Sequence, residues 1–209
     1  MWISGGDQSF SDNIVHMVLA VIPGSPPGSK GISLFLVPKH LPSGERNDVY
    51  VGQFQHKMGA AACTNAEMVL GEKSGEGAVG YLVGNVNEGL KCMFCMMNEA
   101  RIFVGATAVG SGIAGYQASL QYARDRRQGR HPSLKDPSTP MVRIIEHSDV
   151  NRMLLQQKAY VEGSLALCVY TASIQDHMEQ CTSDPEEKQR LNMLLEFLIP
   201  ITKAWPSEW

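Results

Sequence analysis

The sequence contains no apolar run as long as a membrane span, and nothing after Met1 resembles a signal peptide. Its five cysteines are an odd number in mostly apolar settings, which argues against a disulfide framework. An excess of one charge is also missing, because 18 basic and 21 acidic residues give a net charge of -3. We therefore expect a protein of the cytoplasm, without a membrane span and without a general attraction to nucleic acid.

Metal ligands at a recognisable spacing are missing as well. Cys92 and Cys95 form a C-x-x-C pair, but neither a second ligand pair nor a thioredoxin-like strand-to-helix context accompanies it. We interpret these cysteines as small apolar residues on a helix face, and we predict no metal site.

The first part of the chain has the pattern of β-structure. Short apolar runs alternate with turn clusters such as Pro23-Gly24-Ser25-Pro26-Pro27-Gly28. We expect the end of a strand at Trp2-Ile3-Ser4 and further strands at 14–22, 31–38, 49–55, 64–70 and 79–83. Such strands predict a small antiparallel β-barrel or sandwich over residues 1–84.

The rest of the chain, residues 85–209, has helical periodicity. We predict one long helix over 96–128, preceded by a helix that starts at Asn87-Glu88-Gly89-Leu90 and either continues into it or kinks against it. Two more helices are expected at 149–178 and from Asp184 onward. The fold class is therefore α+β, with the β domain followed by an incomplete up-and-down four-helix bundle of three long helices.

Two arginines near the ends of the long central helix suggest two distant sites. Arg101 and Arg126 are 25 positions apart, which at 100° per residue leaves them within about 20° of one face. The rise of the helix separates them by roughly 37 Å. They cannot serve one small ligand.

Six motifs follow one another along the chain: Trp2-Ile3-Ser4-Gly5-Gly6, Lys57-Met58-Gly59, Asn87-Glu88-Gly89-Leu90, Asn98-x-x-Arg101, Tyr122-Ala123-Arg124-Asp125-Arg126-Arg127-Gln128 and Glu146-His147. In this order they resemble the acyl-CoA dehydrogenase superfamily, in particular the long bacterial branch that includes the 3-methylmercaptopropionyl-CoA dehydrogenases. The resemblance implies that residues 1–84 are an N-terminally truncated middle β domain and residues 85–209 a C-terminally truncated helical bundle domain. We thus expect a fragment of a longer protein.

The resemblance implies an FAD-dependent oxidoreductase of fatty acid metabolism that dehydrogenates the α,β bond of an acyl-CoA thioester. The residues expected to bind FAD are Trp2, Ile3, Ser4, Arg126, Arg127, Gln128 and His147. Asn98 and Arg101 are expected to bind the CoA part of the substrate. Arginine suits a pyrophosphate because its planar donors pair bidentately with phosphate oxygens.

The catalytic base of the family is a Glu in a late Glu-Gly-Thr motif, which this chain does not contain. We therefore expect no catalytic residue within it, and read Glu99, Glu146, Glu162 and Glu196 as structural or surface residues. The resemblance further implies electron-transfer flavoprotein as the electron acceptor, and a homodimer or homotetramer.

Three alternatives remain open at this point. An acyl-CoA oxidase would share every motif. A nucleic-acid-protecting relative on the same fold would need a broad basic surface, which the net charge of -3 disfavours. A purely structural helical module would explain the missing base.

Overall fold

The computed structural model describes residues 2–59, 61–131, 133, 136–180 and 184–208. The chain divides into two compact units, Met1–Met96 and Met97–Trp209, which we call the β unit and the helical unit and describe separately. Their boundary lies inside helix α1 (Gly89–Asp125). The domain boundary expected between residues 84 and 85 stays a prediction.

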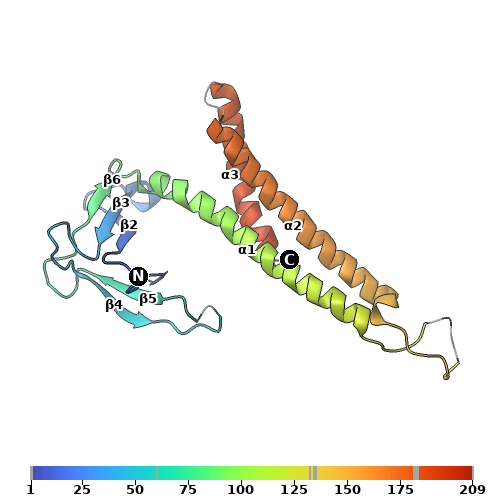
Figure 1. The fold of residues 1–209 in the computed structure, drawn as a ribbon. Helices are drawn as coiled ribbons and strands as arrows, with labels where there is room; N and C mark the ends of the chain where they lie inside the picture. The colour runs from blue at the N-terminus through green and yellow to red at the C-terminus, as the bar shows by residue number, and fades with distance from the viewer. Residues whose placement is uncertain (1, 60, 132, 134–135, 181–183, 209) are drawn as a thin grey trace. The chain divides into compact units, whose positions relative to one another are not determined.

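The β unit contains two separate three-stranded antiparallel sheets, with strand orders β1-β5-β4 and β2-β3-β6 (Figure 1). The strands are β1 (Trp2–Ser4), β2 (Val15–Val21), β3 (Ile32–Pro38), β4 (Val49–Phe54), β5 (Asn65–Leu70) and β6 (Tyr81–Val83), with a 3-10 helix at Gly28–Gly31 before β3. The expected strands are all present. Over the described residues the sheets form no closed barrel, so the sandwich alternative is the one observed.

Apolar side chains from both sheets form the core of the β unit. Val18 and Val37 come from β2 and β3, and they cluster with Val49, Ala66 and Met68 from β4 and β5. Strands that alternate buried and exposed side chains present one apolar face each. The hydrophobic effect at this shared face holds the two sheets together.

The start of α1 lies against β3, which explains the Asn87-Glu88-Gly89-Leu90 motif. A Cβ on Gly89 would lie 2.3 Å from the carbonyl carbon of Ser33 and 2.5 Å from the nitrogen of Leu34. Asn87 has a left-handed φ of 68°, and its N–H donates to Ser33 Oγ at 2.9 Å. Only glycine fits this close approach of helix and strand.

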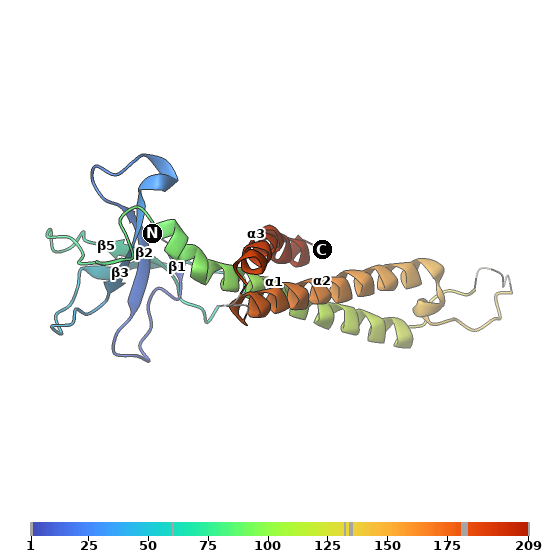
Figure 2. The same cartoon turned by 90° about the horizontal axis from the view of Figure 1, so that it is seen from above.

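The helical unit contains residues 97–125 of α1 followed by α2 (Ser148–Gln180) and α3 (Pro185–Glu208), with a 3-10 helix at Ile144–Glu146. Helix α1 is continuous, so the two predicted helices at its start are one. Figures 1 and 2 show α2 returning alongside α1. Helix α3 packs on α2 through a buried cluster of Ile174, Leu191, Leu195 and Ile199.

Glycines allow close packing on α1 at some positions only. A Cβ on Gly105 would lie 2.3 Å from the carbonyl oxygen of Thr202 in α3, and one on Gly112 would lie 3.2 Å from Val161 in α2. Gly110 and Gly115 face open space, with no described atom within 4 Å of an added Cβ. Close helix packing therefore explains Gly105 and Gly112.

By length and composition, α1 is also apolar enough to span a membrane, with a mean hydropathy of 1.2 over 18 residues. The expectation that no apolar stretch reaches this length is wrong for α1. A mostly buried core helix of a soluble protein passes the same test, whereas 11% of this window is buried. One such helix among the described residues is weak evidence for a membrane protein.

Candidate functional site

The chain leaves α1 into a short antiparallel ladder at one end of the helical unit. Gln128 N–H donates to the carbonyl of Val142 at 2.9 Å, and Val142 N–H donates to the carbonyl of Gly129 at 3.1 Å. Arg127 and Arg143 face each other as a β-bridge. These backbone groups pair across the ladder and not along a helix.

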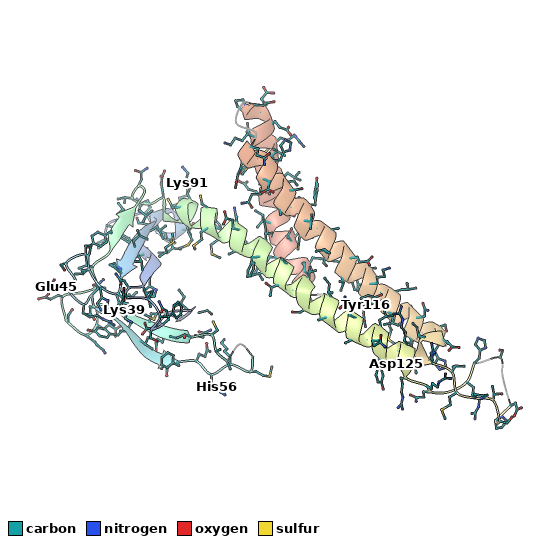
Figure 3. The ribbon with its side chains drawn as sticks, in the orientation of Figure 1. Lys39, Glu45, His56, Lys91, Tyr116 and Asp125 are labelled. Atoms are coloured by element: carbon teal, nitrogen blue, oxygen red, sulfur yellow. The ribbon has the colours of Figure 1, made fainter. Side chains whose placement is uncertain are left out.

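The predicted helix end at Gln128 is therefore wrong, because α1 ends at Asp125. The prediction that Arg101 and Arg126 lie on one helix face assumes a helix through residue 126, so it applies only as far as Asp125. Within the continuous helix, Arg101 and Asp125 are 24 positions apart, or about 36 Å along the axis. Figure 3 labels Asp125 in the last turn of α1, where the ladder begins.

Gln128 and His147, both expected at the cofactor, lie in direct contact. The Nε2 atom of His147 donates to the carbonyl oxygen of Gln128 at 2.7 Å. A Cβ on Gly129, which has a left-handed φ of 69°, would lie 3.4 Å from Cε1 and Nε2 of the same ring. Because His147 immediately precedes α2, this bond ties the start of α2 to the segment that follows α1.

The guanidinium groups at this end differ in what they bind. Arg127 Nη1 donates to the carbonyl of Met141 at 3.1 Å, whereas Arg126 is exposed. The side chain of Asp125 accepts a hydrogen bond from Gln121 Nε2 at 2.7 Å. Among the described residues, the salt bridges lie elsewhere in the chain. The positive charge of Arg126 and Arg127 is left without a paired carboxylate, a donor set that fits an anionic phosphate group.

Asn98 and Arg101 lie one helical turn apart on α1, both half-buried. Residues three positions apart share a helix face, so the amide and the guanidinium can reach one ligand together. Their distance from the ladder along α1 makes this a second, separate place.

Trp2, Ile3 and Ser4 form β1 in the β unit, paired with Glu67, Ala66 and Asn65 of β5. Ile3 packs against the core, and the exposed Ser4 accepts a hydrogen bond at its Oγ from Asn65 Nδ2 at 3.3 Å. The side chain of Trp2 lies outside the described part of the structure. The backbone of β1 is thus held at the sheet edge, while the Ser4 hydroxyl stays accessible.

The four carboxylates considered above are all exposed. Glu146 accepts from the N–H of Arg143 at 3.2 Å, and Glu162 lies 3.6 Å from Lys158. Glu196 accepts from Asn192 Nδ2 at 2.9 Å. The contacts of Glu146, Glu162 and Glu196 are local, and the structural or surface role of the four glutamates stays a prediction. Over the described residues no cluster of His, Cys, Asp or Glu could hold a metal ion.

Sequence reasoning missed the ladder itself. Val142 and Arg143, which pair with residues 127–129, lie in a polar segment with no periodicity. The proline and glycine content there indicates a loop but does not say which backbone groups meet. Arg130, which donates to two carbonyls of this segment, was also missed.

Comparison with known proteins finds homologues over the whole chain. The chain is 38% identical over 98% of its length to the broad-specificity linear acyl-CoA dehydrogenase of Mycobacterium tuberculosis. It is 39% identical over 100% of its length to the 3-methylmercaptopropionyl-CoA dehydrogenase of Ruegeria pomeroyi. It spans about a third of these relatives, 34% and 35% of their lengths. No family model matches the sequence.

A solved structure shares the fold. The acyl-CoA dehydrogenase of Bacillus anthracis, solved in complex with FAD, superposes with a TM-score of 0.70 and 21% identity. The match covers 99% of this chain and 32% of that one. At this identity the likeness concerns the fold alone.

Proposed function

We propose, because this chain is a homologue of the acyl-CoA dehydrogenases, that it is a segment of an FAD-dependent acyl-CoA dehydrogenase. The whole enzyme would oxidise the bond between the α and β carbons of an acyl-CoA thioester. The observation that supports this most directly is the cationic end of the helical unit, where an exposed Arg126 follows α1 and His147 binds Gln128.

In this proposal the ladder end of the helical unit binds the cofactor. Arg126 and Arg127 would bind its pyrophosphate, because guanidinium groups attract and chelate phosphate oxygens and Arg127 has only Nη1 engaged, by Met141. Gln128 and His147 would lie beside it, held together by their own hydrogen bond. When bound, FAD supplies the acceptor for the substrate hydride.

In the β unit, we propose that Trp2, Ile3 and Ser4 of β1 also bind FAD. The pairing of β1 with β5 fixes the backbone of these residues. The exposed Ser4 hydroxyl can donate one hydrogen bond while accepting the one from Asn65. Its part would be to orient a polar edge of the cofactor.

Asn98 and Arg101 would bind the CoA moiety at the other place on α1. A guanidinium pairs with CoA phosphates, and the amide one turn away can donate to or accept from the same ligand. We assign no catalytic residue to this chain, because the glutamates considered above, Glu99, Glu146, Glu162 and Glu196, are exposed. The general base would come from a part of the protein that this chain does not cover.

We further propose a cytoplasmic enzyme that assembles as a homodimer or homotetramer and passes its electrons to an electron-transfer flavoprotein. Large apolar side chains stay exposed on the helices, among them Phe103 at 72%, Phe197 at 66% and Leu155 at 62%. Burial of such side chains against other parts of an assembly would remove apolar area from water.

The test is the visible absorbance of the full-length protein that contains this chain. It should purify yellow or become yellow with added FAD, and the flavin band should bleach without oxygen when a straight-chain acyl-CoA is added. A protein that cannot be loaded with FAD would refute the proposal. Flavin that stays oxidised with every acyl-CoA tried would refute the assigned reaction.

A further inference from the structure

We propose that Arg130 is a positioning residue: its guanidinium holds the crossover segment 137–141 against residues 126–130 and so fixes how Arg126 and Gln128 are presented to an anionic ligand. The ligand part of this inference rests on the proposed function. We call the hydrogen bonds from the Arg127 and Arg130 guanidinium groups to carbonyls of residues 137–141 the brace. The brace is a property of the chain alone and does not depend on a ligand.

Two guanidinium groups reach three carbonyls of one segment. Arg130 Nε donates to the carbonyl of Thr139 at 2.6 Å, and its Nη2 donates to the carbonyl of Pro137. Arg127 Nη1 donates to the carbonyl of Met141 at 3.1 Å. The acceptors are residues 137, 139 and 141, in a segment that turns at residues 137–138.

The brace extends the backbone ladder. The ladder bonds of Gln128 and Gly129 to Val142 account for one side of the crossover. Between Gly129 and Val142 the crossover forms a backbone hydrogen bond within itself, from Thr139 N–H to the carbonyl of Asp136 at 3.1 Å. The side chain of Arg130 therefore holds the part of the crossover segment that the backbone ladder does not reach.

Arginine is suited to this role in a way that lysine is not. Its planar fork places Nε and Nη2 for two acceptors at once, whereas a lysine ammonium is a single point of charge. With both of these donors engaged, Arg130 is poorly arranged to chelate a phosphate. Arg126 has no side-chain hydrogen bond to the described residues and keeps its whole fork for a ligand. Arg130 thus only holds the crossover segment, Arg127 does so through Nη1 alone, and Arg126 is an exposed cation.

The experiment compares Arg130→Lys and Arg130→Gln in the full-length protein, with Arg124→Gln as the control. Arg124 is an exposed arginine in the last turn of α1, so its loss changes the charge but not the brace. The first readout is hydrogen exchange at the amides of Gln128 and Val142. Both Arg130 variants should lose protection there, and the control should keep it. Unchanged protection in the Arg130 variants would overturn the brace.

The second readout is the dissociation constant of FAD as a function of salt concentration. Loss of two charge-assisted hydrogen bonds should weaken FAD binding about tenfold or more in both Arg130 variants, with the salt dependence unchanged because no phosphate contact is lost. If Arg130→Lys binds like the unmodified protein and Arg130→Gln has a shallower salt dependence, Arg130 is a direct phosphate ligand and the inference is wrong.

The two proposals fail in different ways. If the unmodified protein binds no FAD, the proposed function and the ligand part of the inference fall, while hydrogen exchange still decides the brace. If the Arg130 variants lose hydrogen-exchange protection but bind FAD with unchanged affinity, the brace exists but does not control how Arg126 and Gln128 are presented to the ligand. That result overturns the positioning role.

Discussion

The hydroxyl oxygens of Thr171 and Thr202 lie 2.8 Å apart and join α2 to α3 inside the helical unit. Both residues are 0% exposed. Thr171 Oγ1 also donates to the carbonyl of Leu167 at 2.9 Å, so the hydroxyl of Thr202 is the donor in the pair. The two threonines thus form a polar contact inside an apolar helix interface.

Thr171→Val should destabilise the helical unit by about 1–3 kcal/mol, because it leaves the buried hydroxyl of Thr202 without this acceptor. The double variant with Thr202→Val should cost less than the sum of the two single changes, since it removes both polar partners together. Urea unfolding of the four proteins measures both quantities. Additive single changes would mean that the hydroxyls do not interact.

Gly105→Ala should destabilise the helical unit by about 1–3 kcal/mol, because its Cβ would overlap the carbonyl oxygen of Thr202 and force α1 and α3 apart. Gly110→Ala is the matched control on the same helix. It meets no atom within 4 Å, so it should stabilise by up to about 1 kcal/mol through helix propensity. Thermal unfolding of both variants checks the prediction, and equal effects would contradict it.

Stability of the β unit should fall as the pH drops below 6.5. His16 is 6% exposed, and burial lowers its pKa from 6.5, with nearby Asp7 opposing and Lys39 adding to the shift. The folded state keeps His16 neutral while the unfolded chain takes up a proton, so acid favours unfolding from 6.5 down to the folded pKa. Hydrogen exchange at β2 and β3 amides, corrected for its intrinsic pH dependence, measures this.

His16→Gln should flatten that pH dependence, because the replacement has no group that titrates in this range. His56, an exposed histidine of the same unit, provides the control through His56→Gln. The prediction fails if both variants keep the slope of the unmodified protein between pH 5 and 6.5.

Arg101→Gln and Arg126→Gln should separate substrate binding from cofactor binding in the full-length protein. The first should raise the KM for acyl-CoA about tenfold with FAD affinity unchanged, and the second should weaken FAD binding and reduce its salt dependence. About 36 Å of helix axis lies between Arg101 and the end of α1. Flavin titration and steady-state kinetics test both variants, and a loss of FAD affinity in Arg101→Gln would contradict the separation.

Local pattern predicted the elements of this chain well. Each expected strand has a counterpart within two residues of its predicted ends, because turn clusters and apolar runs are local signals. Helical periodicity predicted a helix through Gly105 and Gly112 but left open whether the segment that starts at Asn87 joins it, which the continuous α1 now answers. The reason those glycines are tolerated, close contact with α3 and α2, depends on residues about 50 and 100 positions away.

The sequence was less informative about where elements end and how they pair. Arg126 and Gln128 continue a helical pattern, yet their backbone groups bond to Ile144 and Val142. That competition between helix and ladder depends on a return segment without periodicity. The pairing of six strands into two sheets likewise depends on nonlocal contacts.

The position of β1 has a consequence for biosynthesis. Within the described structure residues 2–4 pair with β5, which ends at Leu70, so this sheet partner does not exist until that residue has left the ribosome. At about 5–20 residues per second, β1 waits for several seconds with its hydrogen-bonding edge open.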